Sequence, residues 1–236
     1  MNSKIMVEEF VSKIDEQLAI RKKELTQLKE IIDASIEISK KFILIRNTIP
    51  AIYANYEGFL QFGFKELIKV IKQFEGNNYY LNKNIMMISI LTSLENHINT
   101  QKSKSERLLE IFNDFYNNKK VLENANLDKY IINHETLYGT CEILGIDLNN
   151  IIKDEERIVF NKESLQILYE RRNVIAHGNI SEGAVYTIPR KKEITEGQVK
   201  SAYLDWNNHY ECVMETLDIL KDIFIDYLIS EKFLEK

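Results

Sequence analysis

The stretch Glu170–Gly178, which reads Glu-Arg-Arg-Asn-Val-Ile-Ala-His-Gly, closes a predicted amphipathic helix. Asn161 is a suitable N-cap and Gly178 a suitable residue just past the C-terminal end, so the helix is expected to cover Lys162–His177. Arg172 falls on the apolar stripe of this helix, at a place where a further apolar residue would belong. An arginine there either pairs with a carboxylate inside the chain or faces a partner subunit or a ligand.

His177 places an imidazole near the same helix end. It follows Arg172 by five residues, about 140° further around an ideal helix, so the two converge only if the last turn loosens, which Gly178 permits. Asn173 precedes His177 by four residues, and its amide is placed to hydrogen-bond the imidazole. The sequence thus indicates a polar site built from a guanidinium, an amide and an imidazole.

Two motifs link these residues to a known superfamily. Arg172–His177 is an Arg-x4-His element with a polar residue directly after the arginine, and it resembles the signature of the HEPN superfamily. The stretch Arg46–Phe59 is similar to the Arg, Tyr-Ala and Glu-Gly-Phe pattern in an early helix of one HEPN branch. HEPN domains are all-helical, and many are metal-independent ribonucleases. The resemblance therefore implies an all-α fold and RNA cleavage.

Metal-free RNA cleavage needs a base for the ribose 2′-hydroxyl, a cation for the phosphate and an acid for the departing 5′-oxygen. His177 suits the role of base or acid, and Arg172 suits that of the cation because its planar fork bonds two phosphate oxygens. By resemblance, two protomers join these helix ends in one composite cleft, with no metal and no cofactor. The expected supporting residues are Asn173, Arg171, Glu57 and Arg46.

The second motif suggests how Glu57 and Arg46 approach the site. Pro50 lies inside a predicted helix, where it leaves the carbonyl of Arg46 without its usual donor and introduces a kink. Such a kink would bring Arg46 and Glu57 into a cleft. A buried carboxylate needs a cationic partner, and Arg172 is the first candidate for Glu57.

The composition predicts an all-α antiparallel helical bundle in a single domain, residues 1–236. The 236 residues are 44% apolar and include only two prolines and eight glycines, which leaves few helix breaks. Residues 1–40 hold a long helix in which apolar residues recur every seven. These residues are Val11, Leu18, Leu25 and Ile32. The helix is expected either in an antiparallel hairpin within the monomer or in a protruding arm that forms a coiled-coil dimer.

Residues 179–196 are expected to form one irregular loop or short hairpin, because they mix glycine, proline and β-branched residues. Arg190, Lys191 and Lys192 in this segment, together with Arg171, form the best local basic patch. The patch either grips RNA phosphates or is an exposed charged turn. The net charge of −5 excludes a general nucleic-acid coat, so RNA binding requires a local patch or a site between subunits.

Other site classes have little support in the sequence. Cys141 and Cys212 stand alone, without the spacing of a disulfide framework or a zinc site. Asp205 and His209 are one helical turn apart and could share a metal, but a third ligand is missing and an ordinary side-chain pair is the simpler interpretation. With no apolar run long enough to span a membrane and no signal peptide, we expect a cytoplasmic protein.

The resemblance implies RNA, including tRNA, as substrate, a homodimer, and an antitoxin or sensor protein as a further partner, in toxin–antitoxin or anti-phage defence. In one related toxin pattern a tyrosine follows the histidine by two residues and is modified by a partner enzyme. Asn179 holds that position here, so that mode of neutralisation is not expected. Two alternatives stay open. One is a catalytically inactive HEPN-like module that binds a nucleotide or a protein, and the other is a structural protein organised by the first helix.

Overall fold

The computed structural model confirms the all-α class. It describes residues 3–73, 81–83, 85–87, 103–117, 141, 144–146, 162–178, 185–188 and 193–234. The helices in this part of the chain are α1 (Ser3–Ala34), α2 (Ile38–Lys72), α4 (Lys104–Tyr116), α7 (Lys162–Ala176) and α8 (Glu196–Ile229). Extended pairing in the same residues is limited to an isolated antiparallel bridge between Leu81 and Leu234.

The chain divides into two compact units, and α1, α2 and α8 each contribute to both. We call Met1–Ile14, Gln61–Ile151 and Asp222–Lys236 the first unit, and Asp15–Leu60 and Ile152–Lys221 the second unit. The motif residues of α2 and all of α7 belong to the second unit. The expectation of a single domain stays a prediction.

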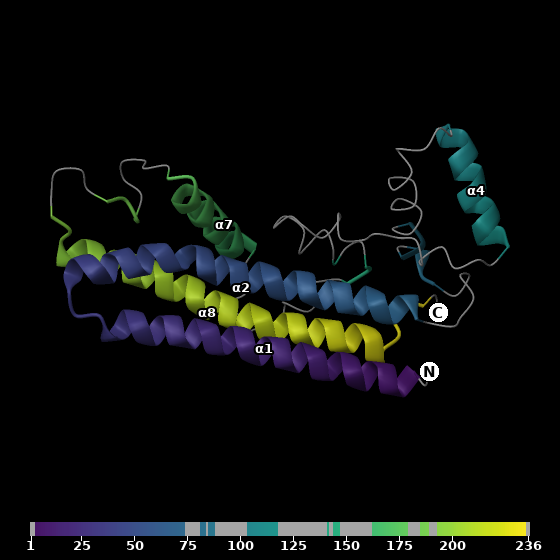
Figure 1. The fold of residues 1–236 in the computed structure, drawn as a ribbon, viewed down its shortest axis with the longest axis horizontal. Helices are drawn as coiled ribbons and strands as arrows, with labels where there is room; N and C mark the ends of the chain where they lie inside the picture. The colour runs from purple at the N-terminus through teal and green to yellow at the C-terminus, as the bar shows by residue number, and fades with distance from the viewer. Residues whose placement is uncertain are drawn as a thin grey trace. The chain divides into compact units, whose positions relative to one another are not determined.

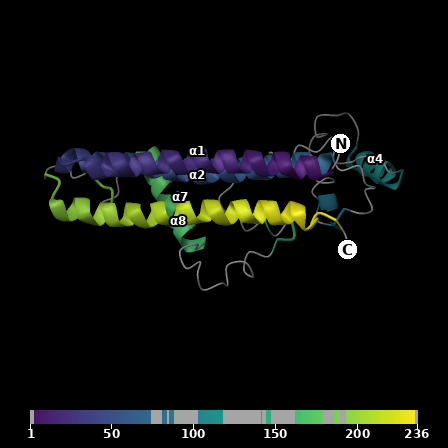
Figure 2. The ribbon, with the colours of Figure 1, turned by 90° about the horizontal axis from the view of Figure 1, so that it is seen from below.

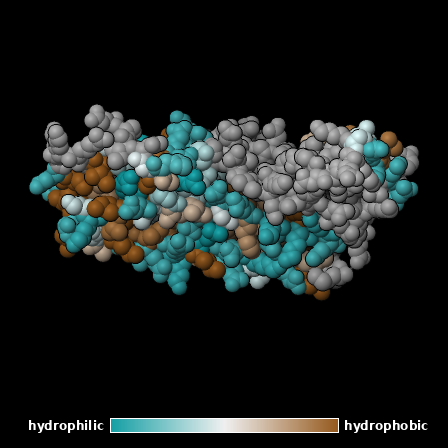
Figure 3. Space-filling view, turned by 45° about the horizontal axis from the view of Figure 1, so that its top comes forward, coloured by the Kyte–Doolittle hydropathy of each residue, from teal (hydrophilic) through white to brown (hydrophobic). Residues whose placement is uncertain are grey.

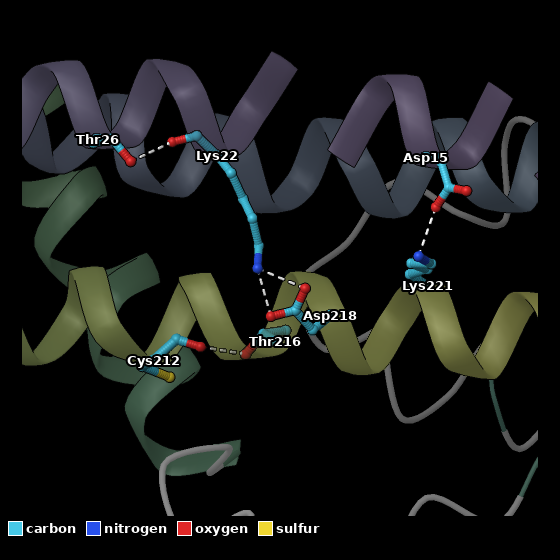
Figure 4. Close-up of polar contacts among 7 residues, drawn as sticks. All are labelled: Asp15, Lys22, Thr26, Cys212, Thr216, Asp218 and Lys221. Atoms are coloured by element: carbon cyan, nitrogen blue, oxygen red, sulfur yellow. Dashed lines mark hydrogen bonds and ion pairs between the residues drawn. The ribbon is translucent and has the colours of Figure 1, made fainter. Parts of the chain in front are cut away.

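Ion pairs fix the antiparallel register of α1 and α8 in the second unit. Asp15, Lys22 and Lys29 are spaced by seven residues along one side of α1, and they meet partners that descend in number along α8. The pairs are Asp15 with Lys221, Lys22 with Asp218, and Lys29 with Glu211. Figure 4 shows the first two of them bridging the two helices. Pairs of this kind at the surface set the register more than they stabilise the fold.

Buried side chains of the long helices form the core of the second unit. The α1 residues Leu18, Leu25 and Ile32 are buried, so the seven-residue face of this helix is covered by its own chain. In this unit Arg21 of α1 lies against Gly58 of α2, and the fully buried Trp206 of α8 donates from Nε1 to Thr48 of α2, 2.8 Å away. Within the second unit, α1 runs opposite to α2 and α8 (Figures 1 and 2).

In the first unit, α2 and α8 pack closely at Gly63. A Cβ atom at this position would overlap the Phe224 ring, so only glycine leaves room for that ring. Phe64 meets the same ring edge to face, with 4.9 Å between centroids. Lys13 of α1 contacts Glu66 of α2 at 2.9 Å, and the Tyr227 hydroxyl donates to the Leu144 carbonyl at 3.1 Å.

Most helix ends lie where the local sequence signals place them. The break between the first two helices is short, since α1 ends at Ala34 and α2 begins at Ile38. The sequence Thr195-x-x-Gln198 forms a capping box before α8, because Thr195 Oγ1 accepts from the Gln198 amide and Gln198 Oε1 accepts from the Thr195 amide.

A second capping box opens α4. The Ser103 hydroxyl accepts from the Glu106 amide, and the Glu106 carboxylate accepts from the Ser103 amide, so Ser103 and not Ser105 caps this helix. In the predicted loop or hairpin, residues 185–188 and 193–195 are described, and they form a turn and irregular backbone. The expected N-cap Asn161 and the rest of that loop lie outside the described residues.

The described surface mixes charge with scattered apolar side chains. Ile31, Ile36, Ile38 and Ile43 are exposed around the connection between α1 and α2. Figure 3 shows hydrophobic side chains gathered at the left end of the face it draws, the end at which Figure 1 places this connection. None of the described helices combines the length and apolar character needed to cross a bilayer.

We predict that Gly63→Ala lowers the free energy of unfolding by about 1–3 kcal/mol, because the added methyl displaces the Phe224 ring from a packed position. Urea denaturation measures the change. Gly197→Ala is the matched control, because the nearest heavy atom to a Cβ there is 3.9 Å away. Equal effects of the two substitutions would contradict the packing argument.

Candidate functional site at the C-terminal end of α7

Helix α7 lies against both α2 and α8 in the second unit. Leu165 and Leu168 are buried and anchor its first half. On one side the Tyr169 ring meets Tyr53 of α2, with 5.8 Å between centroids. On the other side Arg171 reaches α8. The helix therefore holds the Arg-x4-His element against two long helices, as the crossing of α7 in Figures 1 and 2 shows.

Arg172 keeps its positive charge without a carboxylate partner among the described residues. Its guanidinium lies over the Tyr53 ring, 5.3 Å from the centroid, and its Nη1 donates to Asn173 Oδ1 at 2.8 Å. Both contacts are with neutral groups. A ring face and an amide orient a guanidinium without neutralising it, so Arg172 can still bind an anion.

Two contacts expected around Arg172, one between Arg172 and Glu57 and one between Asn173 and His177, are absent from the described structure. No ion pair joins Glu57 to Arg172 within the described residues, so the predicted pairing is wrong. Instead, burial and the charge of Glu57 raise the pKa of the Tyr53 hydroxyl, while the charge of Arg172 opposes that rise. Asn173 was expected to bond the His177 imidazole, but its side-chain oxygen accepts from Arg172. The guanidinium of the neighbouring residue is the stronger donor.

His177 is exposed just past the last residue of α7. Its amide donates to the Asn173 carbonyl at 3.0 Å, and the Gly178 amide donates to the Ile175 carbonyl at 3.2 Å. Gly178 has a φ of 65°, as expected for the residue that ends a helix. The last turn is thus continuous and then tightens, so the loosening that would let Arg172 and His177 converge is not present. Arg172 and His177 consequently stay about 140° apart around the helix.

Arg171 takes part in a polar cluster with a carboxylate on α8. Arg171 Nε and His209 Nε2 each lie 3.6 Å from Asp205 Oδ2, and the Arg171 guanidinium lies over the Tyr186 ring at 5.9 Å from its centroid. We call Arg171, Tyr186, Asp205 and His209 the Asp205 cluster. Arg171 therefore acts as the partner of Asp205, whereas it was expected to extend a basic patch. The simple side-chain pair predicted for Asp205 and His209 is present.

Burial shapes the electrostatics of this cluster. Tyr186 is 4% and His209 5% exposed. No hydrogen bond of ordinary geometry within the described structure reaches Arg171 Nε, the Tyr186 hydroxyl, Asp205 Oδ2 or His209 Nε2. Burial, followed by the charge of Asp205, raises the pKa of the Tyr186 hydroxyl, which therefore stays protonated. Burial also disfavours the Asp205 carboxylate, but His209, Tyr186 and Arg171 outweigh it and lower the pKa of Asp205.

The remaining candidates are less closely connected to α7. The Arg46 side chain donates to Asn47 at 3.3 Å, and among the described residues it makes no contact with Glu57. Pro50 lies within α2, which continues on both sides of it. Arg190, Lys191 and Lys192 lie outside the described residues. The described part of the chain holds no group of three metal-binding side chains.

The involvement of Asp205 with Arg171 is the feature that sequence reasoning missed. The spacing of Asp205 and His209 is visible in the sequence, but nothing in it shows that α7 meets α8 at this level. Only the three-dimensional packing of the second unit supplies Arg171 and Tyr186 as partners.

We predict a pH-dependent contribution of Asp205 to stability. A pKa lowered below 3.8 in the folded state stabilises the fold above that value, and this stabilisation is lost as the pH falls through the folded pKa. The difference in unfolding free energy between wild type and Asp205→Asn should therefore shrink as the pH falls from about 5 to about 3. Urea titrations across this range test the expectation. A constant difference would show that Arg171, Tyr186 and His209 do not favour the carboxylate.

Comparison with known protein families gives one match. The model of one family, described as RiboL-PSP-HEPN, matches residues 16–226. This match covers most of the chain, including both motif stretches. No curated protein and no solved structure matches the chain. The helical fold, the Arg-x4-His element at the end of α7 and the extent of this match together show that the chain belongs to the RiboL-PSP-HEPN family.

Proposed function

We propose that this chain is a metal-independent endoribonuclease whose active site is completed in a homodimer. One observation carries the proposal. Arg172 has no anionic partner in the described structure and lies five residues before an exposed His177, whereas the adjacent Arg171 is paired with Asp205. A free cation and an imidazole are two groups that cleavage of a phosphodiester uses.

In the proposed reaction the neighbouring 2′-oxygen of the same RNA strand forms a bond to phosphorus while the bond between phosphorus and the 5′-oxygen breaks. An imidazole removes the proton of the 2′-hydroxyl, and the 2′-oxygen attacks phosphorus. Arg172 stabilises the charge on the equatorial oxygens through its planar fork. An acid protonates the departing 5′-oxygen. The products are a 2′,3′-cyclic phosphate and a 5′-hydroxyl, and no metal enters any step.

A second protomer is proposed because the geometry of a single chain does not bring all the catalytic groups together. About 140° separates Arg172 from His177 around α7, and one imidazole cannot serve as base and acid on opposite sides of the phosphate. A two-fold axis beside the end of α7 would supply a second arginine and a second histidine. Asn173 orients Arg172 in this proposal, while Glu57 and Arg46 line the approach.

The biological setting is a further part of the proposal and rests on the family. It comprises tRNA or another RNA as substrate, an antitoxin or sensor protein as partner, Arg190, Lys191 and Lys192 as phosphate contacts, and a role as a toxin or anti-phage effector. The alternative is a catalytically inactive HEPN-like module that binds a nucleotide or a protein, with Arg172 holding the dimer through Glu57.

We predict that the purified protein cleaves total RNA in EDTA and leaves cyclic-phosphate ends. Arg172→Ala and His177→Ala should each lower kcat by at least about 100-fold, because each removes a group that acts in the transition state. Arg172→Lys should restore only part of the loss, since an ammonium cannot bond two oxygens as a fork does. Gel analysis of end-labelled RNA before and after phosphatase treatment identifies the product ends.

Glu170→Ala is the matched control on the same helix, because Glu170 is exposed and its side chain bonds only to Gln166 among the described residues. This variant should cleave RNA as the wild type does. All variants must sediment like the wild type, since loss of a dimer would itself abolish a composite site. Cleavage that requires a divalent metal, or that survives both Arg172→Ala and His177→Ala, would refute the proposal.

A further inference from the structure

We propose that Asp205 is the positioning residue for the catalytic end of α7. This inference rests on the proposed function of Arg172 and His177 and adds to it a residue of α8 that belongs to neither family motif. Asp205 Oδ2 lies 3.6 Å from Arg171 Nε, directly next to Arg172 in the chain. The Arg171 guanidinium in turn lies over the ring of Tyr186, nine residues after His177, at 5.9 Å from the ring centroid. Through Arg171, Asp205 thus connects to the chain on both sides of the site.

The side chains of the Asp205 cluster are partly or fully buried. The Arg171 side chain is 29% exposed and that of Asp205 26%, while Tyr186 and His209 are almost fully buried. Removing the carboxylate charge leaves a guanidinium and a phenol without their anionic partner in a site that water reaches poorly. Such groups move toward solvent or toward one another because an unpaired buried polar group is costly.

The effect of that movement falls on the C-terminal half of α7. Leu165 and Leu168 fix the first half by apolar burial, which does not depend on Asp205. The second half is held by polar contacts, Arg171 to α8 and Arg172 to the Tyr53 ring of α2. Releasing Arg171 allows the helix end to shift, and a displacement of about 1 Å in a catalytic group can reduce the rate about 100-fold.

Hydrogen exchange tests the positioning role without reference to RNA. In Asp205→Asn, amides of the C-terminal half of α7 should exchange at least about tenfold faster than in the wild type, while those of α1 keep their protection. Asp218→Asn is the matched control. Asp218 is on the same helix and is also ion-paired, but to Lys22 of α1. It should leave α7 exchange unchanged. Unchanged α7 exchange in Asp205→Asn, or equal acceleration in every helix, would overturn the inference.

Kinetics separate positioning from general loss of stability. Asp205→Asn should lower kcat about 10- to 100-fold and leave KM within about threefold, because Asp205 does not touch the RNA. Asp205→Glu should recover part of kcat, since it keeps the charge. A kcat equal to that of the wild type, or an equal loss in Asp218→Asn, would contradict the role. If the wild type cleaves no RNA, the proposed function fails while the exchange result still decides the hold on α7.

Discussion

Arg171 and Arg172 are neighbours in the chain. Successive residues of an α-helix are rotated by about 100° around its axis, so the two side chains reach different partners. Arg171 meets the Asp205 carboxylate of α8, whereas Arg172 lies over the neutral ring of Tyr53 of α2. The site depends on this division. If both arginines were neutralised, α7 would present no cation to a phosphate. If neither were, its end would have no fixed direction.

The long helices supply the rigid surface on which that division rests. Acidic and basic residues at seven-residue spacing on α1 set its register with α8, and buried Leu25, Ile32 and Trp206 fill the second unit. Since α7 has only fifteen residues, it would be marginal alone, and its geometry comes from the helices that it meets. The Arg-x4-His element therefore lies on the shortest helix of the second unit that the structure describes.

Sequence reasoning found the elements and the motif but not their contacts. The start of α8 at Glu196 and the role of Gly178 at the end of α7 followed from local capping and turn chemistry, which depends on neighbouring residues alone. The Glu57 pairing failed for the opposite reason. Which carboxylate reaches an arginine is decided by helix packing between distant segments, and in the described structure Asp205 lies beside Arg171 while no acidic group pairs with Arg172. The fold alone does not determine the catalytic roles proposed for Arg172 and His177, so RNA cleavage assays test them.

The central claim is that α7 uses one arginine for structure and offers the other to phosphate. NMR of the arginine Nε–H groups tests it most directly, with Arg171→Lys and Arg172→Lys used to assign the two signals. A 2′-O-methyl RNA oligonucleotide, which lacks the attacking hydroxyl, is titrated into the protein in EDTA. The account predicts that the Arg172 signal shifts with RNA concentration while the Arg171 signal stays in place. A shift of Arg171 alone, or no shift of Arg172 when RNA is bound, would contradict it.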